Sequence, residues 1–205
     1  MKSLGVVALT CLSFSSICAH KNTQKKQAED AEKRAAAAVK ASGQEGPQKS
    51  AGEIRLAKDL AELKLEKGMS IKFPNGKNDL MYFQIEIKPS ENYWQGGRFT
   101  FTFKIPDSYP HEPPKVLCDQ IVYHPNLDTK GNICLNVLRE DWSPVQTVTS
   151  VIFGLLFLFI DPNASDPLNS EAAKDLMQST SNFKSNVRKA MMGGIINGVR
   201  FTKVI

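Results

Sequence analysis

The run from Val148 to Ile160 (VTSVIFGLLFLFI) constrains the fold more than any other segment, because nearly all of its residues are apolar. Such a segment has to be buried. It is shorter than the roughly 20 residues that a membrane-spanning helix needs, and Asp161-Pro162 end it. The run therefore predicts a buried core helix and not a membrane span.

Strands are predicted ahead of this helix. Residues Leu80 to Lys88 (LMYFQIEIK) and Arg98 to Ile105 (RFTFTFKI) alternate in character and are separated by a turn-rich link that ends in Gly96-Gly97. Alternation with a short link favours antiparallel neighbours. A further strand is expected at Lys115 to Asp119, after the proline-rich turn Tyr109 to Pro114 (YPHEPP). Together these segments predict an antiparallel meander.

Helices are predicted at both ends of the folded region. The first begins near Gly52 and has an apolar stripe and a basic outer face. The stripe consists of Ile54, Leu56, Leu60, Leu63 and Leu65, and the outer face carries Arg55, Lys58 and Lys64. Two more helices are expected near Ser170 to Gln178 and Asn182 to Asn197. The order helix, strands, irregular segment, helices predicts an α+β domain.

The chain divides into an apolar segment (residues 1–20), a polar linker (21–50) and a core domain (51–205). The apolar run Leu4 to Phe14 is typical of a secretory signal, whereas the weak basic start and Ile17 near the cleavage position argue against one. A docking segment and a misassigned start of the gene are the alternatives. The linker is rich in Lys, Gln, Glu and Ala and cannot bury enough apolar surface to fold alone.

Composition excludes several classes of function. The net charge of +5 is modest and the 26 Lys and Arg are spread along the chain, which does not favour nucleic-acid binding. The four cysteines form no CxxC pair, so neither a zinc site nor a disulfide scaffold is predicted and reduced thiols are expected. No phosphate-binding loop and no paired metal carboxylates are present in the sequence. No bound cofactor or metal is therefore expected.

Chemistry is most readily placed in the irregular segment from Tyr123 to Pro144. Cys134 lies there after Gly131, where the backbone can turn. Its thiol could be accessible and reactive, or it could be a small buried hydrophobe between Ile133 and Leu135. Cys118, inside a predicted strand, is interpreted as structural.

Four other residues have two interpretations each. His124 could activate Cys134 as in a thiol hydrolase, or it could hold its own turn by hydrogen bonds. Asn126 could cap that turn or donate to an oxyanion near Cys134. Trp142 could be packed or could anchor a partner. Asp166 could cap a turn or orient an incoming amine.

These residues fall into one ordered pattern that resembles the ubiquitin-conjugating enzyme family. The pattern covers roughly Gly52 to Val199. It consists of Tyr109-Pro110 and Pro113-Pro114, then His124-Pro125-Asn126, Gly131-Asn132-Ile133-Cys134-Leu135 and Trp142-Ser143-Pro144. The resemblance implies a fold with an N-terminal helix, a four-stranded antiparallel meander, an irregular active-site segment and C-terminal helices.

Within the family, the chain resembles the branch that conjugates the NEDD8/Rub modifier. The similarity lies in Leu135 to Pro144 (LNVLREDWSP), Gly193-Gly194-Ile195 and the basic Gln24 to Gln27. The SUMO-conjugating branch is less similar, because it has extra residues between its cysteine and its tryptophan. A conjugating enzyme for ubiquitin itself and a non-catalytic modifier-binding module of the same fold are the alternatives.

The resemblance implies a role for each residue of the pattern. Cys134 would be the thioester nucleophile, Asn126 would support the loop and the oxyanion, and Asp166 would position the attacking lysine. His124, Pro125 and Trp142 would be structural. Two substitutions depart from the branch: Ala164-Ser165 replace a proline and an acidic residue next to Asp166, so a differently ordered loop is expected there.

Partners also follow from the resemblance. His111, Pro144 and Val145 would bind a RING ligase that acts on cullins, and Arg55 and Lys58 would help to bind the modifier-activating enzyme, where the pathway consumes ATP. The N-terminal segment would imitate the branch's docking tail. A monomer in the cytoplasm and nucleus is expected, unless residues 1–19 act as a signal.

Overall fold

Helix α2 (Ala51–Glu62) opens the described part of the chain, since the computed structural model describes residues 49–205. A capping box closes its first turn: Ser50 Oγ accepts a hydrogen bond from Glu53 N, and the Glu53 carboxylate accepts one from Ser50 N. The predicted start near Gly52 is confirmed. The stripe is wrong at Ile54, which is 61 % exposed. The buried face passes through Leu56 instead, and two residues along a helix turn it through about 200°.

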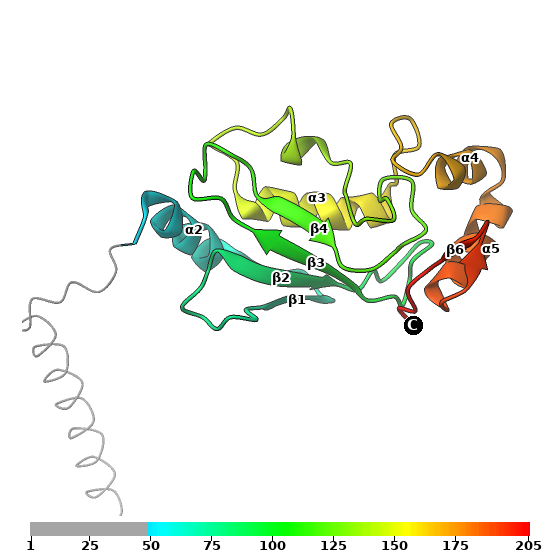
Figure 1. The fold of residues 1–205 in the computed structure, drawn as a ribbon, viewed down its shortest axis with the longest axis horizontal. Coiled ribbons are helices and arrows are strands. Elements are labelled where there is room, and N and C mark those ends of the chain that lie inside the picture. The colour runs from blue at the N-terminus through cyan, green and yellow to red at the C-terminus, as the bar shows by residue number, and fades with distance from the viewer. Residues whose placement is uncertain (1–48) are drawn as a thin grey trace, which may run out of the picture. The chain divides into compact units, whose positions relative to one another are not determined.

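A four-stranded antiparallel sheet follows in the order β1-β2-β3-β4 (Figure 1). Its strands are β1 (Met69–Lys72), β2 (Tyr82–Ile87), β3 (Phe99–Lys104) and β4 (Lys115–Cys118). The predicted meander is confirmed. Buried apolar pairs face each other across β2 and β3, including Ile85 with Phe101 and Ile87 with Phe99. Strand β1 was not located from the sequence, because it is short and only half-buried.

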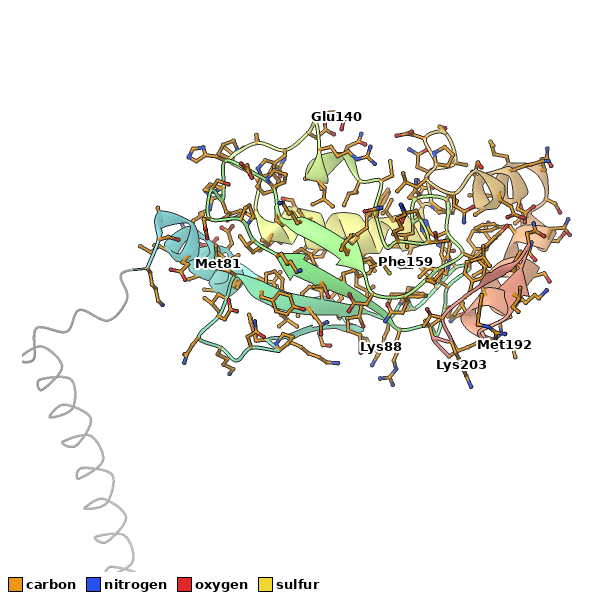
Figure 2. All side chains as sticks on the ribbon, viewed as in Figure 1. Met81, Lys88, Glu140, Phe159, Met192 and Lys203 are labelled. Carbon is orange, nitrogen blue, oxygen red and sulfur yellow. The ribbon has the colours of Figure 1, made fainter. Side chains whose placement is uncertain are left out.

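Helix α3 (Val148–Ile160) has the predicted bounds and lies along the sheet (Figure 1). Phe159 points among the side chains between helix and sheet, where its ring stacks on Phe99 at 4.6 Å (Figure 2). The predicted core helix is confirmed on the side that faces the sheet, where Val151, Ile152 and Leu155 are buried. Phe153 and Phe157 on the uncovered side are 36 % and 56 % exposed.

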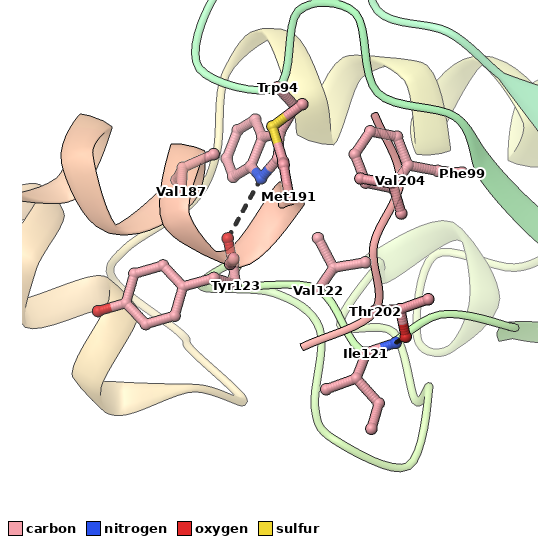
Figure 3. Close-up of a pocket in the computed structure, with 10 residues that line it drawn as sticks. Trp94, Phe99, Ile121, Val122, Tyr123, Val187, Met191, Thr202 and Val204 are labelled. Carbon is pink, nitrogen blue, oxygen red and sulfur yellow. Dashed lines mark hydrogen bonds between the residues drawn. The ribbon is translucent and has the colours of Figure 1, made fainter. Parts of the chain in front are cut away.

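The C-terminal elements are α4 (Ser170–Gln178), α5 (Thr180–Met191) and a hairpin of β5 (Ile195–Ile196) with β6 (Val199–Arg200). The bounds of α4 are as predicted, whereas the predicted extension of α5 to Asn197 is wrong. Gly193 has a φ of 82° and ends the helix there, since glycine adopts this conformation at little cost. Helix α5 packs on Trp94 and Tyr123 around a cavity of about 10 Å³ (Figure 3), which is too small for a ligand.

Two searches of residues 49–205 gave no candidate. No helix among these residues is long and apolar enough to cross a membrane. In the same range, no cluster of histidine, cysteine and acidic side chains could hold a metal ion. The predicted segment 1–20 and nearly all of the linker 21–50 lie outside the described residues.

Gly131 is expected to be the most sensitive glycine of the domain. Its φ is 84°, and a Cβ atom built on it would lie 2.3 Å from the carbonyl oxygen of Cys118. Gly131→Ala should therefore lower the free energy of unfolding by about 3 kcal/mol, through left-handed strain and a backbone clash together. Urea denaturation measures this.

Gly76→Ala is the matched control, because Gly76 has a φ of 87° and no atom within 4 Å of the added Cβ. It should cost only the strain, about 1 kcal/mol. Equal costs for the two variants would show that the contact with Cys118 contributes nothing.

Candidate active site

A tight hairpin between Leu127 and Ile133 presents Cys134. Leu127 and Ile133 form an isolated antiparallel bridge, and Cys134 N donates to the carbonyl of Asn126 at 2.9 Å. Inside the hairpin, one carboxylate oxygen of Asp128 accepts from the backbone N–H of Lys130 and of Asn132, both at 2.8 Å. These bonds fix the backbone that leads into the cysteine.

The Cys134 thiol lies against a carboxylate. Its Sγ donates to Asp166 Oδ2 at 3.3 Å, and the residue is 8 % exposed. Burial raises the pKa of the Cys134 thiol, the Asp166 hydrogen bond raises it further, and the positive charge of Arg139 opposes both. The thiol is therefore protonated near neutral pH and is not a preformed thiolate.

Cys118 provides a contrast. It is buried in β4, and burial raises the pKa of its thiol to about 12. Such a thiol is inert in water. The structural interpretation of Cys118 therefore agrees with its environment.

Asn126 joins the two loops on either side of the cysteine. Its side-chain Nδ2 donates to the carbonyl of Asn163 at 2.8 Å, and its Oδ1 accepts from Asn163 N at 2.9 Å. Asn163 Oδ1 in turn accepts from Ser165 N at 2.8 Å. The loop that carries Ala164-Ser165 is thus anchored at Asn163, three residues before Asp166. Asn163 was missed by sequence reasoning; its place after Asp161-Pro162 at a helix end was the available signal.

His124 has both ring nitrogens engaged. Nδ1 accepts from Asn126 N at 2.9 Å, so Nε2 carries the proton and donates to the carbonyl of Leu158 at 3.0 Å. The ring is fully buried and stacks on Trp94 at 4.3 Å. No nitrogen remains for Cys134, so a cysteine–histidine hydrolase dyad is excluded. His124 supports the loop.

Acid should destabilise the domain through His124. Burial lowers the pKa of His124 to about 4. Protonation of Nδ1 would also break its hydrogen bond with Asn126 N, because two N–H donors would then face each other. The unfolded chain takes up this proton near pH 6.5 and the folded one only near pH 4. The free energy of unfolding should therefore decrease as pH falls from about 6.5 to about 4, by about 3 kcal/mol from this group.

Denaturation curves across this pH range check the His124 effect. His124→Asn should flatten the slope relative to the wild type, because the titrating ring is gone. His111→Gln is the control, since it removes an exposed histidine and keeps the buried one. A slope that is the same in all three proteins would contradict the prediction.

The remaining predicted residues lie in two groups. Near Cys134, the Pro125 carbonyl accepts from Leu168 N and Asn169 N, both at 2.9 Å. Farther away, Trp142 is half-buried and donates to the carbonyl of Pro110 at 2.9 Å. His111, Lys58 and Pro144 are exposed, and Val145 is 84 % exposed.

Arg55 does not lie on the outer face of α2, and that expectation is wrong. Its side chain is only 30 % exposed and pairs with Asp59 at 2.9 Å. Asp59, which is 4 % exposed, was not singled out in the sequence. An acidic residue four positions after an arginine was the signal for this pair.

Two depressions lie along the segment that carries the cysteine. One, of about 540 Å³, is formed by Cys134, the exposed side of α3 and the loop from Asp161 to Ser165. The other, of about 690 Å³, is formed by Ile133, strand β4 and Leu168. Only the first depression is lined by Cys134 itself, so the thiol is approached from that side.

Comparisons with known proteins define the class. The family model described as ubiquitin-conjugating enzyme matches residues 55–191. An Arabidopsis thaliana protein named probable NEDD8-conjugating enzyme Ubc12-like is 49 % identical over 183 residues, covering 89 % of this chain and 95 % of the relative. The Drosophila melanogaster Nedd8-conjugating enzyme UbcE2M is 45 % identical, covering 87 % and 94 %.

Solved structures agree with this result. Ubc12 of S. cerevisiae superposes with a TM-score of 0.73 at 36 % identity, covering 89 % of this chain and 98 % of that one. The chain belongs to the ubiquitin-conjugating enzyme family, and it is a thioester-forming transferase with the fold that the motifs implied. Within that family, the relatives named above confirm its similarity to the neddylation branch.

Proposed function

We propose that this chain accepts a NEDD8-type modifier from its activating enzyme as a thioester on Cys134 and transfers it to a lysine. The observation that carries the proposal is the Cys134 thiol at 3.3 Å from the Asp166 carboxylate, on a backbone that Asn126 fixes. The names of the relatives in Arabidopsis and Drosophila support the choice of modifier.

In the first step, the Cys134 sulfur attacks the thioester carbonyl on the activating enzyme. A new C–S bond forms, the old C–S bond breaks, and the thiol of the activating enzyme leaves. The proton of Cys134 passes to the Asp166 carboxylate, to which it already donates, and from there to the leaving sulfur, so Asp166 is again ionised after the step. ATP is used at the activating enzyme and not by this chain, so no cofactor is required here.

In the second step, a lysine amine attacks the same carbonyl. A C–N bond forms, the C–S bond breaks, and Cys134 leaves as the thiolate and is reprotonated. Asp166 orients and deprotonates the amine, and the Asn126 amide, which uses one N–H on Asn163, has a second N–H to donate to the developing oxyanion. The depression lined by Cys134 leaves room beside the sulfur for the modifier tail and the lysine.

The thioester is protected because, among residues 49–205, the only base hydrogen-bonded to the sulfur is the weakly basic carboxylate of Asp166. Histidine is the residue type that most often acts as a base, but both ring nitrogens of His124 are hydrogen-bonded to the backbone of Leu158 and Asn126. Transfer then depends on a partner that orders the loaded modifier and the lysine. A RING ligase acting on a cullin is the proposed partner.

Surfaces for these partners are proposed on the exposed residues. His111, Pro144 and Val145 contact the ligase, and Lys58 contacts the activating enzyme together with the apolar and basic N-terminal tail. The alignment with the Arabidopsis relative spans more residues than lie between Lys49 and Ile205, which supports a tail that belongs to the enzyme. The enzyme acts as a monomer in the cytoplasm and nucleus.

The test of the proposed function is a charging assay. Purified protein is incubated with ATP and either NEDD8 with its activating enzyme or ubiquitin with its own. A reducible adduct with NEDD8 alone is expected. Charging with ubiquitin alone would overturn the choice of modifier, and charging with neither would favour the non-catalytic binding module.

A further inference from the structure

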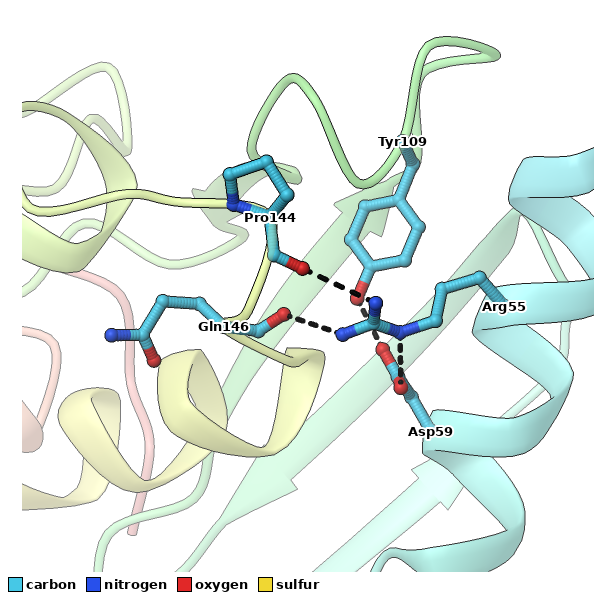
Figure 4. Close-up of polar contacts among 5 residues, drawn as sticks. All are labelled: Arg55, Asp59, Tyr109, Pro144 and Gln146. Carbon is cyan, nitrogen blue, oxygen red and sulfur yellow. Dashed lines mark hydrogen bonds and ion pairs between the residues drawn. The ribbon is translucent and has the colours of Figure 1, made fainter.

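One guanidinium group joins helix α2 to the turn ahead of α3 (Figure 4). Arg55 Nη1 donates to the carbonyl of Pro144 at 3.2 Å, and Nη2 donates to the carbonyl of Gln146 at 3.1 Å. The two carbonyls belong to residues some 90 positions along the chain from Arg55. A forked guanidinium can hold two acceptors at once, which a single ammonium group does less well.

A buried acid and a tyrosine fix the direction of this guanidinium. Asp59 accepts from Arg55 Nε with one carboxylate oxygen and from the Tyr109 hydroxyl with the other (Figure 4). Asp59 and Tyr109 are 4 % and 2 % exposed, so neither can turn away without leaving a buried polar group unpaired. Arg55 is therefore aimed at the turn by its own helix.

The turn that Arg55 holds carries an unusually exposed apolar side chain. Val145 lies between the two bonded carbonyls and is 84 % exposed. Because the backbone is fixed on both sides of Val145, the chain cannot rotate locally to turn this side chain toward the protein. Nothing in its own turn buries this side chain, so its outward position depends on the backbone bonds.

We propose that Arg55 is a positioning residue, which presents Val145 to the ligase by bonding to the carbonyls on either side of it. This inference rests on the proposed function, since it assigns Val145 to the ligase surface. Under this proposal, Arg55 does not bind the activating enzyme directly, as the family resemblance had implied. Arg55 contributes through the order of the turn and not through its charge.

Arg55→Lys separates order from charge, because lysine keeps the positive charge but loses the fork. Rates are measured for NEDD8 charging, for discharge of the loaded enzyme to free lysine, and for discharge stimulated by a RING ligase of the neddylation pathway. The ligase-stimulated rate should fall about tenfold, which is the loss of roughly one charge-assisted hydrogen bond. The other two rates should change less than about twofold. Lys184→Ala, an exposed change on α5, is the control.

Two further measurements test whether Arg55 acts through Val145. Amide hydrogen exchange at Gln146, whose N–H donates to Ser143 at 2.9 Å, should accelerate in Arg55→Lys. Val145→Ala should lower ligase stimulation by itself, and adding Arg55→Lys to it should lower stimulation little further.

The outcomes distinguish the inference from the function on which it rests. Full ligase stimulation in Arg55→Lys, unchanged exchange at Gln146, or additive effects with Val145→Ala would each overturn the positioning role. A fall in charging alone would assign Arg55 to the activating enzyme instead. A wild-type enzyme that charges with NEDD8 but shows no ligase stimulation would reject the ligase step itself.

Discussion

Cys134→Ser is expected to abolish the reducible thioester and to give a slower, reductant-resistant oxyester with the same modifier. The serine oxygen occupies the position of the sulfur, but an ester is less reactive toward amines than a thioester. Cys134→Ala should form no adduct at all. Transfer to lysine should fall by a factor on the order of 1,000 or more in both variants. Gel electrophoresis with and without thiol reductant measures these products.

Cys118→Ala is the matched control for these variants. Its thiol is buried in β4 and its pKa is raised to about 12, so its removal should leave charging intact. If the reducible adduct persists in Cys134→Ser and disappears in Cys118→Ala, the nucleophile is Cys118. That result would contradict the proposed site.

Asp166→Asn is expected to change two properties of the site in opposite directions. The hydrogen bond and the negative charge of Asp166 raise the pKa of the Cys134 thiol, so their removal should lower that pKa and shift the alkylation profile to lower pH. Iodoacetamide should then react several-fold faster with Cys134 near pH 8. Transfer from the loaded enzyme to free lysine should nevertheless slow by about 10- to 100-fold, because the amine loses the carboxylate that takes its proton.

The opposite signs make the Asp166 prediction specific. If Asp166 only held the loop in place, its removal would not be expected to speed alkylation while slowing transfer. Asp107→Asn, an exposed substitution in the turn after β3, should change neither rate. Slower alkylation together with unimpaired transfer would contradict the assigned role.

The sequence predicted those elements whose pattern is strong along the chain. The apolar run of α3, the alternation in β2 and β3 and the proline-rich turn each reported on the local backbone, and the observed bounds of α3 agree with the expected ones. Strand β1 was missed because its burial pattern is weak, and α5 was drawn too long because Gly193 acts through its backbone angle.

The chemistry of the site was less predictable, because it depends on partners that are distant in sequence. His124 was ambiguous until its two nitrogens were located on Leu158 and Asn126. Arg55 was expected to be free in solvent, since no local pattern indicates a bond to carbonyls some 90 residues away. Family resemblance identified the residues of the site, whereas only the structure gave the atoms that they contact.

The bonds of Asn126 set unequal limits on sequence variation at the two positions that they join. Asn126 forms these two bonds with the donor and the acceptor of its side chain, whereas Asn163 forms them with its backbone N–H and carbonyl alone. Position 126 therefore needs an amide of this length: aspartate cannot donate, and glutamine is one methylene too long. Position 163 can vary as far as this pairing is concerned, so a substitution library should show a narrow choice at one end of the bridge and a wide choice at the other.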